Sequence, residues 1–432
     1  MRSPIVYPGA DELTYEIREI VAVAKKLEQC GVVITWENIG DPVAKGECVP
    51  GWIKDIVAGE VRQDASFGYS PTKGLQTARD FITNERRKEC GIPLDPEDIL
   101  FFNGLGDAIA NVYTYLNRCA RVIGPNPAYP THSSAEGAHA GGKNLTYRLD
   151  PSKGWLPDLA DLRNKVQNNP TITGILIINP DNPTGLVYPR ETLEEIVAIA
   201  RTHDLFLISD EIYAHLAYDK SAMIPLYTLL DDVPALVMRG LSKEVPWPGS
   251  RCGWIEFYNK RNDAQFARYA KTLVDAKMLE VCSTTLPQQV LPAILGDVRY
   301  ATHVRERALG YAKKAALAHA LLRDIPGITA PEPKGAFYYS VVFKDGALNN
   351  THALPIANTQ ARALLEPLLP ALPPDKRFVY YLMAATGICV VPLSGFNSDL
   401  QGFRMTLLEP DEAVFKKTVS AIAENITTYL SG

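Results

Sequence analysis

Short apolar runs alternate with a segment of helical periodicity in the middle of the chain. The runs lie at residues 174–178, 205–208, 236–238 and 253–255, and a helical pattern at 190–203 separates the first two. Parallel strands that are buried on both faces are near-continuous apolar runs, and helices commonly connect them. The pattern predicts an α/β fold with a mostly parallel sheet and helices on both of its faces.

A second region follows this alternation. Residues 297–324 are rich in Ala, Leu, Arg and Lys at helical spacing, which predicts a long helix leaving one domain for another. Short strands are expected at 337–342 and 388–391, and a final amphipathic helix from Pro410. No repeat is apparent. We therefore expect a large domain at residues 51–300 and a small α+β domain made of 1–50 and 301–432.

Composition excludes several classes of protein. The 432 residues carry a net charge of -5, so we expect no nucleic-acid partner. The seven cysteines form no C-x-x-C pair, which favours reduced thiols and a cytoplasmic protein. Pro4 and Pro8 interrupt the N-terminal segment, so no signal peptide is expected. The uncharged window 378–398 contains Gly and Pro, which favours a buried helix and strand over a membrane span.

Histidines give no sign of a metal site. The seven in the chain, including His132 and His139, lack the spacing of zinc ligands. We interpret them as structural or solvent-facing, and no metal is expected.

Polar residues follow three of the expected strands. Asn182, Asp210 and Lys243 each come where an apolar run ends, and ligands of open α/β sheets bind at the carboxyl ends of strands. Each has an ordinary alternative: a turn for Asn182, a helix cap for Asp210 and exposure to solvent for Lys243. A buried carboxylate needs a partner, however. Together the three side chains indicate an aromatic, anionic ligand.

Two arginines and a glycine turn extend this set. Arg251 follows Lys243 by eight residues, and its planar guanidinium suits phosphate. Arg404 lies between apolar residues, so it is expected to be buried and to need an anion, from a ligand or from a structural salt bridge. The Gly104-Leu105-Gly106 segment is either an ordinary turn or a helix N-terminus that binds an anion.

These segments together resemble the class I/II aminotransferases that depend on pyridoxal phosphate, of the aspartate/alanine aminotransferase type. The order and spacing of the segments carry the resemblance, which covers nearly the whole chain. They are residues 38–42, 69–74, 103–108, 127–130, 182–185, 209–213, 242–253 and 402–405. The resemblance implies fold type I, with a large cofactor-binding domain and a smaller α+β domain.

The resemblance also implies catalytic roles. Lys243 would bind pyridoxal 5'-phosphate as a Schiff base and then shuttle a proton between Cα and the cofactor. Asp210 would keep the ring nitrogen protonated, which makes the ring an electron sink. Tyr213 and Asn182 would donate to the phenolate oxygen, and Tyr129 would stack on the ring.

By the same resemblance, five groups hold the cofactor phosphate. They are the backbone N–H groups of Leu105 and Gly106, the hydroxyl of Ser242, the guanidinium of Arg251, and Tyr69 from a second subunit. The last contact implies a homodimer whose active sites lie at the subunit interface.

For the substrate, the resemblance implies that Arg404 binds the α-carboxylate with help from Gly40 and Asn182. The reaction would move an amino group between an L-amino acid, such as alanine or aspartate, and a 2-oxo acid such as 2-oxoglutarate, ping-pong through pyridoxamine phosphate. Alternatives on the same fold are a carbon–sulfur β-lyase, an enzyme like 1-aminocyclopropane-carboxylate synthase, and a cofactor-sensing regulator without catalysis. Only about 40 residues precede Gly40, too few for the DNA-reading module of such regulators.

The chain departs from the family pattern at several positions. Gly106 and Gly240 stand where relatives have polar side chains, which removes two phosphate contacts. No Arg or Lys occurs at 279–289, where dicarboxylate-specific relatives carry an arginine. An acidic substrate would then need either a swing of Arg404 or the entry of another basic residue, such as Lys73, Arg18 or Lys277.

Overall fold

The computed structural model describes residues 5–13, 16–90 and 94–432. Pro4, part of the segment expected not to be a signal peptide, lies outside these residues. The main sheet has eight strands, and β9 and β5 run against their neighbours while the central neighbouring pairs are parallel. The predicted α/β fold is confirmed. In spatial order the strands are β2 (Ile99–Phe102), β9 (Gly253–Tyr258), β8 (Ala235–Gly240), β7 (Phe206–Asp210), β6 (Ile172–Ile178), β3 (Arg121–Asn126), β4 (Thr146–Asp150) and β5 (Leu156–Pro157).

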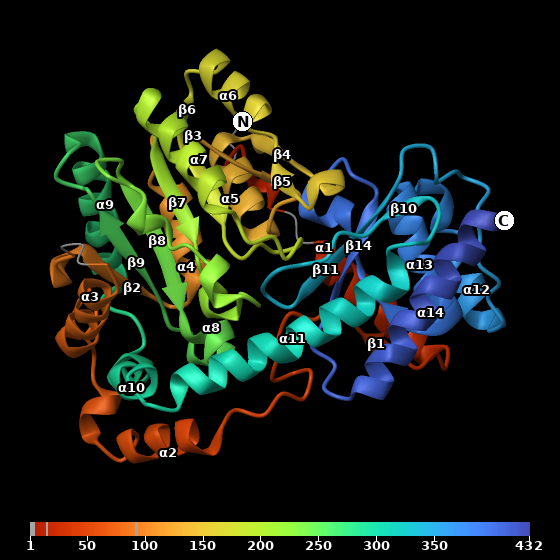
Figure 1. Cartoon of the computed structure of the whole chain (residues 1–432), viewed down its shortest axis with the longest axis horizontal. Coiled ribbons are helices and arrows are strands. Elements are labelled where there is room, and N and C mark those ends of the chain that lie inside the picture. The colour runs from red at the N-terminus through yellow and green to blue at the C-terminus, as the bar shows by residue number, and fades with distance from the viewer. Residues whose placement is uncertain (1–4, 14–15, 91–93) are drawn as a thin grey trace.

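Helices cover both faces of this sheet (Figure 1). The amphipathic α7 (Arg190–Thr202) buries Leu193, Ile196 and Val197 and lies on the face opposite α4. The other helices in this part of the chain are α3 (Gln76–Cys90), α4 (Leu105–Thr114), α5 (Pro130–Ala140), α6 (Leu159–Asn168), α9 (Ala264–Glu280) and α10 (Thr285–Leu295). The expected helix at 190–203 is therefore present.

A second, four-stranded antiparallel sheet forms from the C-terminal third. Its order is β10 (Ile328–Thr329), β11 (Tyr338–Phe343), β14 (Gly402–Thr406) and β13 (Val391–Pro392). The single strand expected at 388–391 is wrong, because Cys389 of β12 (Ile388–Cys389) pairs with β1 (Thr35–Trp36) while Val391 pairs with Arg404. The short run 388–391 thus contributes a strand to each of two sheets. The helices of this region are α1 (Glu16–Gln29), α12 (Thr359–Leu365), α13 (Pro374–Thr386) and α14 (Glu412–Ser431).

The uncharged window is a buried helix followed by a strand, as predicted. α13 buries Phe378, Val379, Leu382 and Met383 before the chain enters β12. In the part of the chain that the structure describes, no helix is both long and apolar enough to cross a bilayer.

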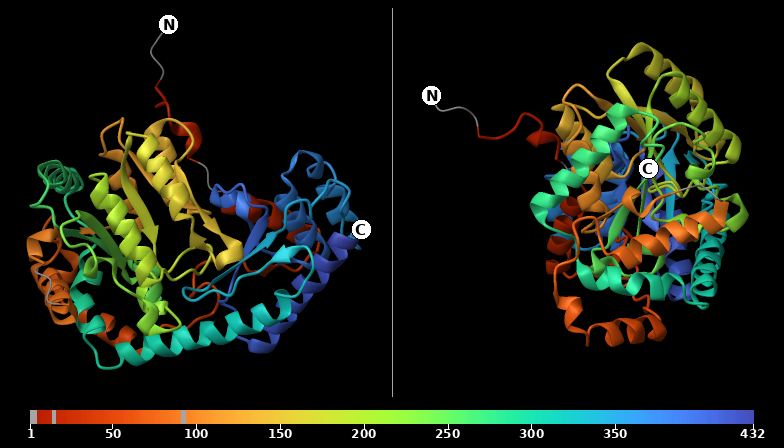
Figure 2. Two further views of the ribbon diagram at one scale, coloured as in Figure 1. Left: turned by 45° about the horizontal axis from the view of Figure 1, so that its top comes forward. Right: turned by 90° about the vertical axis from the view of Figure 1, so that its left-hand side faces the viewer.

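One long helix joins the two sheets. α11 (Tyr300–Leu322) runs from beneath the eight-stranded sheet to the four-stranded one (Figures 1 and 2). It buries Val304, Tyr311, Ala315 and Leu322, three to four residues apart or multiples of that spacing, so a single face packs inward. The predicted helix at 297–324 is confirmed.

Candidate active site

A cavity of about 180 Å³ lies at the carboxyl ends of β6, β7 and β8. The fold therefore places it where open α/β sheets bind ligands. Nine of the ten residues predicted to bind the cofactor line it: Leu105, Gly106, Tyr129, Asn182, Asp210, Tyr213, Ser242, Lys243 and Arg251. Ile109, Ile178, Ile212 and Pro248 complete the lining.

Asn182 follows β6 in a turn that needs its glycine. Gly185 has φ +72, and a Cβ there would lie 2.4 Å from Pro333 Cβ, so the turn packs directly on the segment before β11. The Oδ1 atom of Asn182 is buried and has no hydrogen-bond partner among the described residues. A buried amide oxygen without a donor is costly. Asn182 is therefore suited to a ligand in the cavity.

Asp210 ends β7 and is buried. Its Oδ1 accepts a hydrogen bond from the backbone N–H of Ile212 at 3.1 Å, and its Oδ2 lies 3.2 Å from His132 Nε2. His132 is 0% exposed, and its Nδ1 lies 3.3 Å from Tyr113 Oη. The carboxylate thus has a fixed orientation against an imidazole.

His132 is a site residue that the sequence analysis missed. It was interpreted only as structural or solvent-facing, because no motif links it to Asp210, 78 residues away. One signal was present: His132 lies three residues after Tyr129, so both belong to the same turn of chain entering α5. His139, on the same helix, contacts the carbonyl oxygen of Ala120 instead.

Lys243 lies on α8 (Leu241–Glu244), directly after β8. Its Nζ donates a hydrogen bond to the carbonyl oxygen of Gly40 at 2.6 Å. Burial lowers the pKa of Lys243 to about 8, with the cations Arg404 and Arg251 acting in the same direction and the carboxylates of Asp41 and Asp210 opposing them. Desolvation disfavours an ammonium ion. A sizeable share of Lys243 is therefore a neutral, nucleophilic amine near neutral pH.

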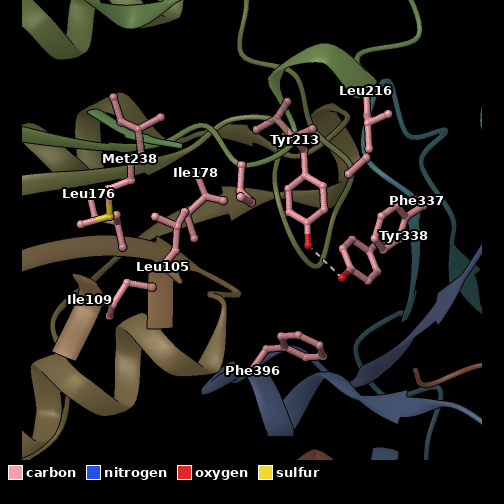
Figure 3. Close-up of a cluster of buried hydrophobic side chains, with 14 of the residues drawn as sticks. Leu105, Ile109, Leu176, Ile178, Tyr213, Leu216, Met238, Phe337, Tyr338 and Phe396 are labelled. Atoms are coloured by element: carbon pink, nitrogen blue, oxygen red, sulfur yellow. Dashed lines mark hydrogen bonds between the residues drawn. The ribbon is translucent and has the colours of Figure 1, made fainter. Parts of the chain in front are cut away.

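Tyr213, which lines the cavity, contacts a second tyrosine, Tyr338. Its Oη lies 2.9 Å from Tyr338 Oη, and the two rings meet edge to face (Figure 3). Burial raises the pKa of Tyr213 well above its ordinary value, and the hydroxyl of Tyr338 adds to the effect. Tyr213 therefore keeps its proton at neutral pH and can donate it in a hydrogen bond. The sequence analysis did not identify Tyr338.

The start of α4 and Arg251 form a cradle of donors. Gly104 has φ +82, and a Cβ there would lie 2.5 Å from Arg251 Nη2, so only glycine lets the guanidinium approach. Arg251 Nη2 also donates to the carbonyl oxygen of Asn103 at 3.1 Å. Leu105 and Gly106 are the first residues of α4. Because no preceding turn of helix supplies carbonyl oxygens for their backbone N–H groups, these groups favour an anion.

Gly240, the other departure from the family pattern, has a structural reason. A Cβ at this position would lie 2.8 Å from the carbonyl oxygen of Cys252 on the neighbouring segment. The close approach of β8 and the chain entering β9 leaves no room for a side chain there. At Gly106, by contrast, a Cβ would meet no atom within 4 Å.

Arg404 lies on β14 and is 2% exposed. Its Nη2 donates to the carbonyl oxygen of Asn38 at 2.6 Å. Its guanidinium lies over the ring of Tyr338 at 4.6 Å and over that of Phe396 at 5.3 Å. The expected burial of Arg404 is confirmed, and two aromatic faces fix the plane of its guanidinium.

Comparison with known proteins identifies the family. A family model described as aminotransferase class I and II matches residues 38–422. The chain belongs to this family. It is therefore a transaminase that depends on pyridoxal phosphate, with the fold type I architecture.

Individual relatives agree. An aminotransferase of Methanocaldococcus jannaschii is 51% identical over 430 residues, which cover 100% of both chains. The glutamate-pyruvate aminotransferase AlaA of Escherichia coli is 32% identical over 76% of this chain and 80% of its own. The structure of an alanine aminotransferase from Pyrococcus furiosus has a TM-score of 0.83 and 27% identity, covering 98% of this chain and 99% of its own.

The donor set of this aminotransferase fits its cofactor. A dianionic phosphate would meet Arg251 and the α4 N-terminus, an aldehyde would meet the Lys243 amine, and a protonated ring nitrogen would meet the Asp210 carboxylate. Asn182 also lines the cavity, and its side-chain NH2 group is the part of the amide that can donate to an oxygen of the cofactor.

The long helix of the aminotransferase holds the lysine segment from behind. Arg307 of α11 donates from Nη1 to the carbonyl oxygens of Lys243 at 2.7 Å and Glu244 at 2.8 Å. The same guanidinium forms an ion pair with Glu47, in the segment that carries Gly40. One side chain thus ties the lysine backbone to the loop that its amine contacts.

Other predicted residues lie elsewhere. Tyr69 is 87% exposed and is not among the residues that line the cavity. Lys73 forms an ion pair with Glu97, and Arg18, Lys73 and Lys277 are all absent from the described lining. The described residues of a single chain therefore offer the cavity no basic side chain for an acidic substrate beyond those already named. Over the described residues, no cluster of three His, Cys, Asp or Glu side chains could hold a metal ion.

Proposed function

We propose that this aminotransferase moves an amino group from an L-amino acid, with alanine favoured, to a 2-oxo acid such as 2-oxoglutarate in two half-reactions. One observation carries the proposal. Lys243, Asp210, Tyr213 and the donor cradle of Arg251 open into a single cavity.

We assign the cofactor contacts as follows. Arg251, Ser242 and the N–H groups of Leu105 and Gly106 hold the phosphate, and the side chain of Tyr129 covers the ring. Bound pyridoxal phosphate supplies an aldehyde for amine exchange and a ring that accepts an electron pair from Cα. Asp210, oriented by His132 at 3.2 Å, holds a proton on the ring nitrogen. Tyr213 and Asn182 donate hydrogen bonds to the phenolic oxygen.

Lys243 is the proton carrier. A pKa of about 8 lets its Nζ take a proton from Cα of the substrate and return it elsewhere without a large energetic penalty in either direction. The Gly40 carbonyl oxygen, 2.6 Å away, gives the freed amine an acceptor that keeps it inside the cavity. Arg404 binds the α-carboxylate together with Gly40 and Asn182.

The preference for alanine rests on two observations. The relatives include proteins named glutamate-pyruvate aminotransferase and alanine aminotransferase. The cavity lining contains no further cation for a second carboxylate among the described residues. An acidic side chain buried without a counter-charge is costly, so aspartate fits less well than alanine. The acceptor 2-oxoglutarate also carries a second carboxylate, so its half-reaction needs Arg404 to swing or another basic residue to enter the cavity.

A homodimer is proposed from an exposed apolar surface. Phe67 and Tyr69 are exposed on one segment, and Met278, Leu279 and Val281 are exposed on another. Hydrogen bonds tie the two segments: Thr72 Oγ1 donates to the Val281 carbonyl oxygen at 3.0 Å. A patch of this kind commonly marks a protein interface. Tyr69 would then complete the phosphate site of the partner subunit, and sedimentation of the active enzyme tests this.

Cellular location is proposed from the thiols. The six cysteines whose side chains are described are free, which suits a reducing cytoplasm; the side chain of Cys90 lies outside the described residues.

Borohydride reduction tests the proposed function. We expect the protein loaded with pyridoxal phosphate to absorb in the visible range and, after reduction, to carry the cofactor on the peptide containing Lys243. A panel of alanine, aspartate, glutamate, aromatic and branched donors with 2-oxoglutarate or pyruvate then ranks the substrates. Label on another lysine, or release of ammonia instead of a new amino acid, contradicts the proposal and favours the β-lyase alternative.

A further inference from the structure

Tyr338 touches each of three groups to which the proposed function assigns a role. It lies on β11 of the four-stranded sheet, while Tyr213 follows β7 of the eight-stranded sheet. Its Oη lies 2.9 Å from Tyr213 Oη, and its ring lies under the Arg404 guanidinium at 4.6 Å. A Cβ on Gly40 would lie 2.5 Å from the same Oη. Figure 3 shows the two tyrosines pointing toward one another beside Phe337 and Phe396.

The proton count at this contact decides its direction. A tyrosine hydroxyl has one proton to donate and two lone pairs to accept with. If Tyr213 donates its proton into the cavity, it can only accept from Tyr338. The bond at 2.9 Å therefore runs from Tyr338 to Tyr213, and a chain of two hydroxyls polarises the outer one.

We propose that Tyr338 is a positioning residue that donates to Tyr213 and so turns the Tyr213 proton toward the phenolic oxygen of the cofactor. The same ring supports the plane of Arg404. Tyr338 thereby links the cofactor side of the site to the carboxylate side, from a different sheet. This inference rests on the proposed function, because it requires Tyr213 to face the cofactor.

Neighbouring contacts hold Tyr338 in place. The backbone N–H of Ala336 donates to the carbonyl oxygen of Leu216 at 3.1 Å, so β11 begins against the segment that carries Tyr213. Two strand positions further on, Ser340 Oγ donates to the carbonyl oxygen of Pro183 at 2.8 Å, in the turn that carries Asn182. The position of Tyr338 is therefore fixed from both sides of the cavity.

The next residue offers a matched control. Tyr339 is equally buried, but its Oη donates to the carbonyl oxygen of Ala330 at 3.0 Å, because successive strand residues face opposite sides. Tyr338→Phe and Tyr339→Phe thus each remove one buried hydroxyl and keep the ring. A merely structural role would make the two variants alike.

The test is a pH titration of the visible absorbance of the bound cofactor, with Tyr213→Phe as positive control. We expect Tyr338→Phe to raise the midpoint by about half to one pH unit, the size of one hydrogen bond, and to weaken cofactor binding about 2- to 10-fold. The weaker cofactor binding is measured from tryptophan fluorescence as pyridoxal phosphate is added to the cofactor-free protein. Tyr339→Phe should leave both values unchanged, and Tyr213→Phe should shift the midpoint further.

Kinetics separate the two contacts of Tyr338. Tyr338→Phe should lower kcat and leave KM for the amino donor, because the ring still supports Arg404. Tyr338→Leu should also raise KM about 10-fold, the effect of about 1.4 kcal/mol. If Tyr338→Phe fails to fold, Gly40→Ala displaces the same hydroxyl from the other side, and we expect the same shift in midpoint.

The outcomes are distinguishable. A midpoint that moves in Tyr213→Phe but in neither Tyr338→Phe nor Gly40→Ala overturns this inference and leaves the proposed function standing. Equal shifts in Tyr338→Phe and Tyr339→Phe overturn it too, because the effect would then be structural. No shift in Tyr213→Phe contradicts the role of Tyr213, and the inference falls with it.

Discussion

Lys243 and Lys277 both have ammonium groups withdrawn from bulk solvent, and their partners differ. Lys277, on α9, is 0% exposed at its side chain and pairs with Asp107 at 3.0 Å and Glu280 at 2.5 Å. Lys243 forms no such pair within the described residues and donates to the backbone oxygen of Gly40 instead. Burial lowers the pKa of Lys243. No paired carboxylate among the described residues neutralises its charge, unlike that of Lys277.

The lowered pKa of Lys243 has a large effect on how much of its amine is neutral. Lowering the pKa of Lys243 from 10.5 to about 8 increases its neutral fraction at pH 7 about 300-fold. The ammonium group of Lys277 instead forms ion pairs with the carboxylates of Asp107 and Glu280. Lys243 is thus suited to act as a nucleophile, and Lys277 links α9 to α4.

The largest expected difference between the two lysines is in activity. Lys243→Met should lower kcat by at least about 10⁴-fold, because it removes both the amine and the proton carrier. Lys277→Met should stay within about 10-fold of the wild-type rate, since Lys277 is absent from the cavity lining. Steady-state assays with saturating cofactor measure both. Comparable losses in the two variants would contradict the assignment of Lys243.

The same substitutions should change stability with opposite signs. At pH 7 Lys243→Met should raise the free energy of unfolding of the cofactor-free protein by about 2 kcal/mol, because a buried ammonium with a lowered pKa costs about 3 kcal/mol and its hydrogen bond returns about 1. Lys277→Met should lower it by about 2 kcal/mol, because two carboxylates lose their cation.

Urea unfolding at several pH values checks the signs. The advantage of Lys243→Met should be complete below pH 8 and fade between pH 8 and 10.5, where the unfolded chain still binds a proton that the folded protein has released. Two variants that are both destabilised at pH 7 would show that the Lys243 ammonium is not strained by burial.

The smallest expected effect is a shift in the titration of Lys243 itself. In the cofactor-free protein, the rate at which an amine-reactive reagent modifies Lys243 should rise with pH, with a midpoint near pH 8. Asp41→Asn should lower this midpoint and Arg251→Met should raise it, each by a few tenths of a pH unit, because the two charges act in opposite directions. Mass spectrometry of the modified peptide measures the rate. A midpoint near pH 10 would contradict the proposed amine chemistry.

The sequence predicted what the strands carry. Asn182, Asp210 and Lys243 each follow an apolar run, and parallel strands bring their carboxyl ends to one edge, so strand order along the chain was enough to group these side chains. The long helix at 297–324 was clear because its periodicity is uninterrupted. The domain limits at residues 50 and 300 stay a prediction.

What the sequence did not predict depends on contacts between distant segments. His132 meets Asp210 only after α5 packs against the large sheet, and Tyr338 meets Tyr213 only after the segment before β11 bonds to the segment after β7. No sequence spacing marks either pair. The exchange of partners between Cys389 and Val391 was hidden for the same reason, since both residues look like one strand. The role of Tyr69 needs a second subunit and stays a prediction.

The contacts of Arg307 fix α11 near Lys243, so the rest of the helix could pivot about this point. The helix is anchored at its N-terminal third to the carbonyl oxygens of Lys243 and Glu244 and to Glu47, and its far end carries the four-stranded sheet. At about 1.5 Å per residue, the stretch from Arg307 to Leu322 is an arm of roughly 22 Å. A tilt of a few degrees about Arg307 would displace the four-stranded sheet, and with it Arg404, relative to Lys243. The segment that carries Gly40 is bonded to both, through Asn38 to Arg404 and through Glu47 to Arg307.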